Sequence, residues 1–106
     1  MNKNYEKLIE CGFQASHAGT KYLLEAMELY APGCFLTKEL YPAIAARHQV
    51  SPAAVERCIR HAIATAAKKG AGDFHDTIVG KYCDRSIGEV LARLYFAEKW
   101  GDWDEN

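Results

Sequence analysis

Four polar side chains with hydrogen-bonding chemistry occur close together in the middle of the chain: Glu56, Arg57, Arg60 and His61. An arginine guanidinium can donate two hydrogen bonds to the O6 and N7 atoms of guanine, and a glutamate carboxylate can accept one from N4 of cytosine. Residues three and four apart lie on the same side of a helix. If this segment is helical, these residue types could therefore read base edges in duplex DNA.

The same spacing has a simpler interpretation. Glu56 and Arg60 stand four apart in the order that favours an ion pair on any exposed helix. The four side chains alone therefore do not establish contact with DNA. Whether they can reach DNA depends on the helices that surround them.

The segment around these residues has clear helix boundaries. Ser51 suits the N-cap and Pro52 the first helical position, while Lys68, Lys69 and Gly70 are typical of a helix end. On a helix over 52–69, one side is apolar and faces the core. The opposite side carries the four polar residues among small ones. The apolar side consists of Val55, Ile59, Ala62, Ile63 and Ala66, and the small residues opposite include Ala64 and Ala67.

The preceding segment completes a helix-turn-helix from about Pro42 to Gly70. The turn at residues 48–50 has the length that this motif requires. Gln49 stands where the turn usually has glycine. We expect Ile44, Val50, Val55 and Cys58 to point inward. The second helix would then present its N-terminal residues to the major groove.

The rest of the chain also reads as helical. Helices are expected over about 4–11, 20–30 and 37–48, the last capped by Thr37 and interrupted at Pro42, and again over 86–100 after the cap Ser86. The stretch 71–81 reads as a loop with one helical turn, and no strand alternation occurs. The predicted fold is an all-α, compact bundle of about six helices, forming a single domain over residues 1–106.

Charge and composition narrow the function. The net charge is −1, but residues 47–69 carry five basic side chains against Glu56 alone. A locally basic segment can meet phosphate, because charges more than about 8 Å apart are largely screened at physiological salt. No apolar run is long enough for a membrane span and no secretory signal is present, so a cytoplasmic protein is expected.

Metal binding, cofactors and catalysis are not expected. The closest grouping of metal-ligating types is Cys58, His61, His75 and Cys83, and it matches no usual ligand spacing. No nucleophile elbow, phosphate-binding loop or H-E-x-x-H motif occurs. We therefore predict neither a metal site nor a cofactor nor an enzyme.

Two strings resemble a known family. The residues Leu40-Tyr-Pro-Ala-Ile-Ala45 and Val55-Glu-Arg-Cys-Ile-Arg-His-Ala-Ile63, together with 19–26 and 36–38, are similar to the C-terminal effector domain of the sporulation-initiation response regulator, stage zero sporulation protein A. The resemblance covers about residues 12–80. It implies a six-helix domain that binds double-stranded DNA, in tandem copies on repeated sites, with RNA polymerase as a further partner. By position it implies base reading by Glu56, Arg57 and Arg60, and contact with the DNA backbone by Ser51, His61, Lys68 and Lys69.

The sequence departs from that family in three places. Ala54 stands where relatives often have a polar or basic residue, and 81–90 is shortened before the last helix. No receiver domain precedes the effector, so we expect a stand-alone homologue that is not activated by phosphorylation within this chain. The alternative function is a protein-interaction module on the same scaffold, in which the acidic end around Trp100 and Trp103 docks a basic partner.

Overall fold

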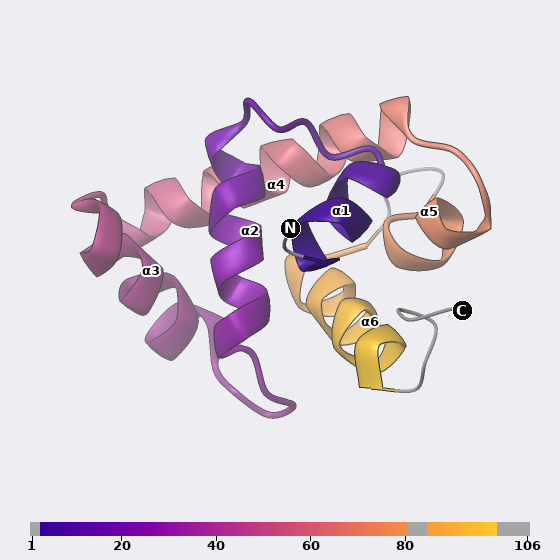
Figure 1. Ribbon diagram of the computed structural model, residues 1–106. Helices are drawn as coiled ribbons and strands as arrows, with labels where there is room; N and C mark the ends of the chain where they lie inside the picture. Colours follow the sequence, from indigo (N-terminus) through magenta and orange to yellow (C-terminus); the bar gives the residue numbers. More distant parts are fainter. Residues whose placement is uncertain (1–2, 81–84, 100–106) are drawn as a thin grey trace.

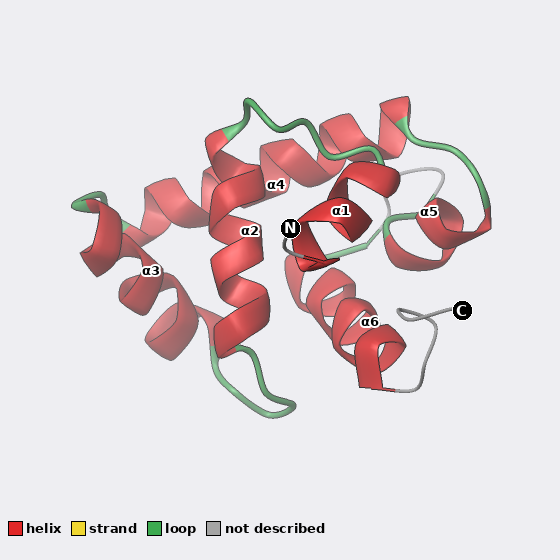
Figure 2. Ribbon diagram, viewed as in Figure 1, coloured by secondary structure: helices red, strands yellow, loops and turns green. Residues whose placement is uncertain are grey.

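The longest helix in the described residues, α4 (Pro52–Lys69), has its main helix contacts with α2 (Ala18–Leu29), α3 (Tyr41–His48) and α6 (Ile87–Lys99). The computed structural model describes residues 3–80 and 85–99. Within these ranges the chain is helical with no β-strand, as the sequence predicts (Figures 1 and 2). The other elements are α1 (Lys3–Glu10), α2 (Ala18–Leu29), the π-helix η1 (Leu36–Leu40), α3 (Tyr41–His48), α5 (Asp73–Ile78) and α6 (Ile87–Lys99).

The ends of α4 are set by local chemistry. The Ser51 hydroxyl accepts a hydrogen bond from the Ala54 N–H at 3.1 Å, and Pro52 occupies the first turn, where a missing N–H costs nothing. At the other end the Gly70 N–H donates to the Ala66 carbonyl at 2.9 Å. Both boundaries therefore agree with the prediction.

The buried side of α4 is wider than the sequence pattern indicates. All five residues of the predicted apolar side are buried, and so is Ala67, which is only 6% exposed. The prediction that Ala67 lies on the outward face of α4 was therefore wrong. Two elements enclose the last turns of α4: the Gly12–Gly70 contact brings the end of α1 against it, and the buried His75 of α5 hydrogen-bonds the Ala66 carbonyl at 3.0 Å.

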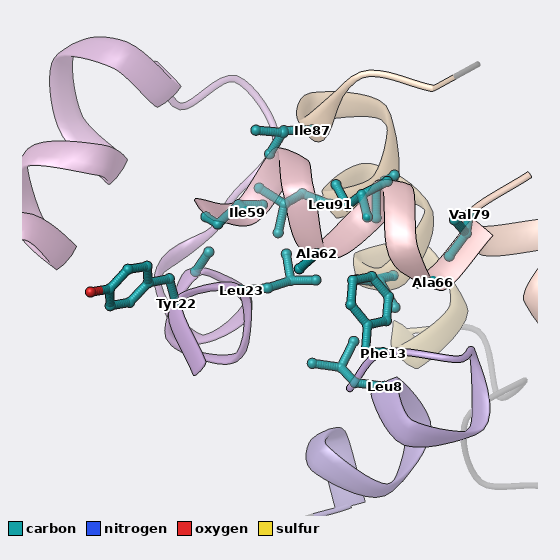
Figure 3. Close-up of a cluster of buried hydrophobic side chains, with 14 of the residues drawn as sticks. Leu8, Phe13, Tyr22, Leu23, Ile59, Ala62, Ala66, Val79, Ile87 and Leu91 are labelled. Atoms are coloured by element: carbon teal, nitrogen blue, oxygen red, sulfur yellow. The ribbon is translucent and has the colours of Figure 1, made fainter. Parts of the chain in front are cut away.

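The most extensive contact between helices joins α2 to α4. The two cross at Gly19, where a methyl group would lie 2.6 Å from the carbonyl carbon of Cys58 and 2.9 Å from Cβ of Ala62. Around this crossing Leu23 of α2, Ile59 of α4 and Leu91 of α6 are buried, within the cluster that Figure 3 shows. A residue without a side chain thus brings the two backbones together and closes the core.

Pro42 divides the segment before the turn, as expected. Its ring nitrogen has no proton to donate to a carbonyl one turn earlier. The chain instead makes wider turns before the proline: Leu40 N–H donates to Phe35 O at 3.2 Å, which closes η1. The predicted Thr37 cap is wrong, because the Glu39 carboxylate accepts the Phe35 N–H at 3.1 Å and the helical stretch begins at Leu36.

The C-terminal part closes the bundle through polar ties. The Ser86 hydroxyl accepts the Glu89 N–H at 3.1 Å, so Ser86 caps α6 as predicted. Arg85 donates to the carbonyls of Asp76 and Thr77 at 2.8 and 3.1 Å, which fastens α5 beside the start of α6. No helix in residues 3–80 and 85–99 combines the length and apolar character of a bilayer-spanning segment.

Candidate nucleic-acid interface

The connection between α3 and α4 is a tight turn of three residues, Gln49 to Ser51. Gln49 has φ 57° and ψ 43°, the left-handed conformation that most side chains disfavour. The Val50 N–H donates back to the Ala45 carbonyl at 3.2 Å, which reverses the chain direction. Gln49 therefore takes up the conformation for which such turns usually employ glycine.

Three of the four residues expected to point inward are enclosed to different degrees. Ile44 and Val55 are fully buried and Cys58 is half-buried. Val50 is 38% exposed, so its prediction as an inward residue was wrong. The left-handed Gln49 turns the chain away from the core before Val50, and the next core residue comes only after Ser51 has started α4.

An acidic residue of α2 holds the end of α3. Both Glu25 oxygens are engaged: one accepts from Arg47 at 3.4 Å and the other lies 2.6 Å from Nε2 of His48. The His48 ring also packs on Tyr22, with ring centroids 5.0 Å apart. These contacts fix α3 against α2, and α2 is itself pressed on α4, so the two helices of the motif are held at one relative orientation.

The structure brings the predicted base-reading residues together on the outward face of α4. Arg57 and Arg60 are exposed and Glu56 is half-buried. The Glu56 carboxylate pairs with the Arg60 guanidinium. Within residues 3–80 and 85–99, no acidic side chain forms an ion pair with Arg57. The face thus offers an acceptor and a paired cation beside an unpaired one.

Shallow hollows flank this face on both sides. One, of about 520 Å³, is bordered by Glu56 and Arg60 of α4 and by Leu36, Tyr41 and Ile87 from the neighbouring elements. The other, of about 510 Å³, lies between Arg57 and His61 of α4 and the start of α2. The guanidiniums of Arg57 and Arg60 therefore border different hollows.

Tyr41 lies next to the Glu56–Arg60 pair and was not predicted. Its side chain is 6% exposed, and burial is the main cause that raises the pKa of its phenol from 10.0 to about 12. The negative charge of Glu56 contributes to this rise, and the positive charge of Arg60 opposes it. Tyr41 thus remains a neutral hydroxyl beneath the pair. Its place in the Leu-Tyr-Pro string was the one sequence signal that pointed to it.

The residues predicted to contact the DNA backbone occupy different places. Ser51 is exposed at the start of α4, with its hydroxyl oxygen engaged as the N-cap. His61 is exposed one turn after Arg57. Lys68 and Lys69 are exposed in the last turn, about 17 Å along the helix from Arg57 at 1.5 Å per residue. Lys68 continues the Arg57–His61 side of α4, while Lys69 projects about 100° further round the helix than Lys68.

The described residues contain no group of three or more histidine, cysteine, aspartate or glutamate side chains that could hold a metal ion. Cys83, which belongs to the grouping considered from the sequence, lies outside the described residues. Trp100 and Trp103, which belong to the predicted acidic docking end, also lie outside them. His75 is buried instead, with Nδ1 2.8 Å from the Asp76 carboxylate and Nε2 at the Ala66 carbonyl. Its contacts are those of a structural residue.

The geometry of α3 and α4, a short helix, a three-residue turn and a long helix with a polar outer face, is the arrangement of a helix-turn-helix. One family model, described as "Sporulation initiation factor Spo0A C terminal", matches residues 5–92, most of the chain. The chain belongs to this family. The resemblance seen in the Leu40–Ala45 and Val55–Ile63 strings is thereby confirmed.

Members of the Spo0A C-terminal family are DNA-binding effector domains of the sporulation response regulator. The family match extends well beyond the helix-turn-helix, from α1 into α6. Within the Spo0A fold, His17 is a further residue that the sequence did not single out. Its ring packs on that of His61 with centroids 5.2 Å apart, although the two residues stand far apart in the sequence.

Proposed function

We propose that the protein is a transcription regulator that binds duplex DNA sequence-specifically through the outward face of α4. The observation that carries the proposal is the cluster of Glu56, Arg57 and Arg60 on an exposed helix face directly after a tight turn. A helix with side chains is about 10–12 Å across, and the major groove is about 12 Å wide. Small residues beside the cluster, such as Ala53 and Ala64, allow close approach to the base edges.

Each residue of the face has a definite role in this proposal. Arg57 and Arg60 donate to guanine, and Glu56 accepts from cytosine while orienting Arg60. Ser51, His61, Lys68 and Lys69 contact phosphates, which fixes the position of the domain on the duplex without reading sequence. Binding by a domain with so few cations is expected to be modest in affinity and to weaken steeply with salt.

The test begins with selection of preferred sequences from random duplexes by the wild-type protein. Arg57→Ala and Arg60→Ala should each reduce the discrimination between the selected and a random duplex by about 1–3 kcal/mol. Lys68→Ala should weaken binding to both duplexes alike, because a phosphate contact carries no sequence information.

A matched control is available on α6. Glu89 and Arg93 form the same four-apart ion pair as Glu56 and Arg60, with 2.7 Å between Nε and the carboxylate, and the Arg93 side chain is 37% exposed against 63% for Arg60. Arg93→Ala should leave discrimination unchanged. If the wild type binds no duplex even at low salt, DNA reading is excluded and the interaction-module function takes its place.

Partners and location follow from the same proposal. If the protein binds repeated sites as tandem copies, a duplex with two selected sites should show two-step binding. If RNA polymerase is a further partner, the DNA-bound protein should retain it on that duplex. Regulation of transcription places the protein with the chromosome, in the cytoplasm. The polar face of α4 is not arranged for catalysis, and we propose a binding function rather than an enzyme.

A further inference from the structure

A pair of histidine rings stands beside the proposed reading face. His17 directly precedes α2, and His61 lies on α4, four residues after Arg57. Their ring centroids are 5.2 Å apart, and the rings are tilted by 33°. Together with Arg57 they border the hollow of about 510 Å³ on the α2 side of α4. Three side chains that can carry positive charge thus converge on one depression.

Among the described residues that line this hollow, none is acidic. Its remaining borders are Ser16, Ala18, Gly19 and Cys58. By contrast, the hollow on the other side of the face has the Glu56 carboxylate at its border, where it pairs with Arg60. The two hollows therefore differ in charge, and the one beside α2 is suited to an anion.

The position of His17 is fixed by the backbone around it. Its N–H donates to the Gln14 carbonyl at 3.1 Å, and the buried Thr20 hydroxyl donates to the same carbonyl at 2.8 Å. Gly19 presses the first turn of α2 onto the Cys58 carbonyl. The imidazole is therefore held at the level of Arg57 and His61, and a ligand there would require little rearrangement of the chain.

One nitrogen of the His17 ring is enclosed in the protein interior. In the part of the chain that the structure describes, Nδ1 of His17 is buried and has no hydrogen-bond partner. Leaving a buried polar atom unpaired costs about 1–3 kcal/mol, so such atoms call for an explanation. Because Nδ1 is enclosed, a ligand can meet this ring only through Nε2.

We infer that His17, His61 and Arg57 form a binding site for one phosphodiester group of the DNA backbone. The inference rests on the proposed function. When α4 enters the major groove, the flank of the helix faces a phosphate strand, and helices next to a recognition helix commonly cross that strand. Nε2 of His17 donates to the phosphate from α2, while His61 and Arg57 donate from α4. The interface thereby extends from α4 onto the start of α2.

The test compares His17→Leu with the wild type on the selected duplex and on a random duplex of equal length. Leucine has a similar size and no N–H donor, so the phosphate loses one charge-assisted hydrogen bond. Binding to both duplexes should weaken about tenfold while discrimination stays intact.

A neutral-phosphate scan separates direct contact from a structural effect. Each phosphate of the selected duplex is replaced in turn by an uncharged methylphosphonate. One position that weakens wild-type binding should have no further effect on His17→Leu. The control Arg93→Ala removes a cation from α6, away from this hollow, and should retain the full wild-type pattern.

The possible results are distinguishable. If the wild type binds duplex and His17→Leu has the same affinity and the same methylphosphonate pattern, this inference alone is overturned. If the wild type binds no duplex at all, the proposed function is overturned. Inorganic phosphate tests the other source of the anion. If phosphate alone shifts the NMR signals of both rings saturably while His17→Leu binds duplex normally, the site takes a free anion and the DNA contact is refuted.

Discussion

The crossing of α2 and α4 at Gly19 allows a stability prediction whose sign is decided by geometry. In Gly19→Ala the new methyl would lie 2.6 Å from the carbonyl carbon of Cys58 and 2.9 Å from Cβ of Ala62, whereas ordinary contacts begin at 3.4 Å. The backbone of α4 cannot rotate away as a side chain could. The two helices must therefore separate by about 1 Å along their most extensive contact.

Two terms oppose each other in this substitution. Alanine is favoured over glycine inside a helix by at most about 1 kcal/mol. Overpacking in a closely packed core costs about 1–3 kcal/mol, and a backbone contact belongs at the upper end of that range. We expect the free energy of unfolding to fall by about 2 kcal/mol. For a domain of this size the melting temperature should drop by roughly 10 °C.

The matched control is Gly88→Ala. Gly88 is the second residue of α6, as Gly19 is of α2, but a methyl there would meet Cδ1 of Leu36 at 3.4 Å and Oγ of Ser86 at 3.9 Å, both ordinary contacts. Gly88→Ala should be neutral or slightly stabilising in urea and thermal denaturation followed by circular dichroism. If Gly19→Ala unfolded at the same urea concentration as Gly88→Ala, the close approach of the two backbones would be refuted.

Three further predictions concern the turn, a buried thiol and the reading face. Gln49→Gly should raise the free energy of unfolding by about 0.5–1 kcal/mol in urea denaturation, because glycine adopts φ 57° without strain. Gln49→Ala should be nearly neutral. Equal stability of the wild type and both variants would argue against the left-handed turn. Burial, and secondarily the negative charge of Glu10, raises the pKa of the Cys11 thiol from 9.0 to about 12. As the pH rises, the thiol of the unfolded chain therefore ionises first. The free energy of unfolding should be unaffected by this thiol below pH 9 and should fall above it by up to about 1.4 kcal/mol per pH unit. Cys11→Ala should flatten that fall between pH 9 and 10, and an unchanged slope would contradict the pKa. Glu56→Gln, which frees Arg60, should raise affinity for random duplex and reduce discrimination in a binding assay; a rise in discrimination would exclude Glu56 as a reader.

Local sequence signals were sufficient where a structural feature depends on neighbouring residues. Ser51, Pro52 and Gly70 mark both ends of α4 because caps are made within one turn of the chain. Pro42 marks the break before α3 for the same reason, since its missing proton affects only the preceding turn. The residue pattern of 42–70 also predicted the helix-turn-helix, and the family strings strengthened the prediction of DNA binding.

The errors had two causes: contacts with neighbours distant in sequence, and local backbone geometry that residue type alone does not decide. Helical periodicity places Ala67 on the outer face, but Ala67 is buried in the last turns of α4, where α1 and α5 contact this helix at Gly70 and at the Ala66 carbonyl. Val50 has the character of a core residue, and only the direction of the chain after Gln49 leaves it exposed. Thr37 lost the expected capping role to Glu39.

The polar residues 56–61 illustrate the division most clearly. Their spacing by itself determined that Glu56, Arg57, Arg60 and His61 share one face of a helix, because helical geometry is local. Only the tertiary structure decided that Arg57 and Arg60 border different hollows, and that His17 joins His61 beside one of them. The reason is that Gly19, with no side chain, lets α2 approach α4 closely, a contact between distant segments that no local pattern encodes.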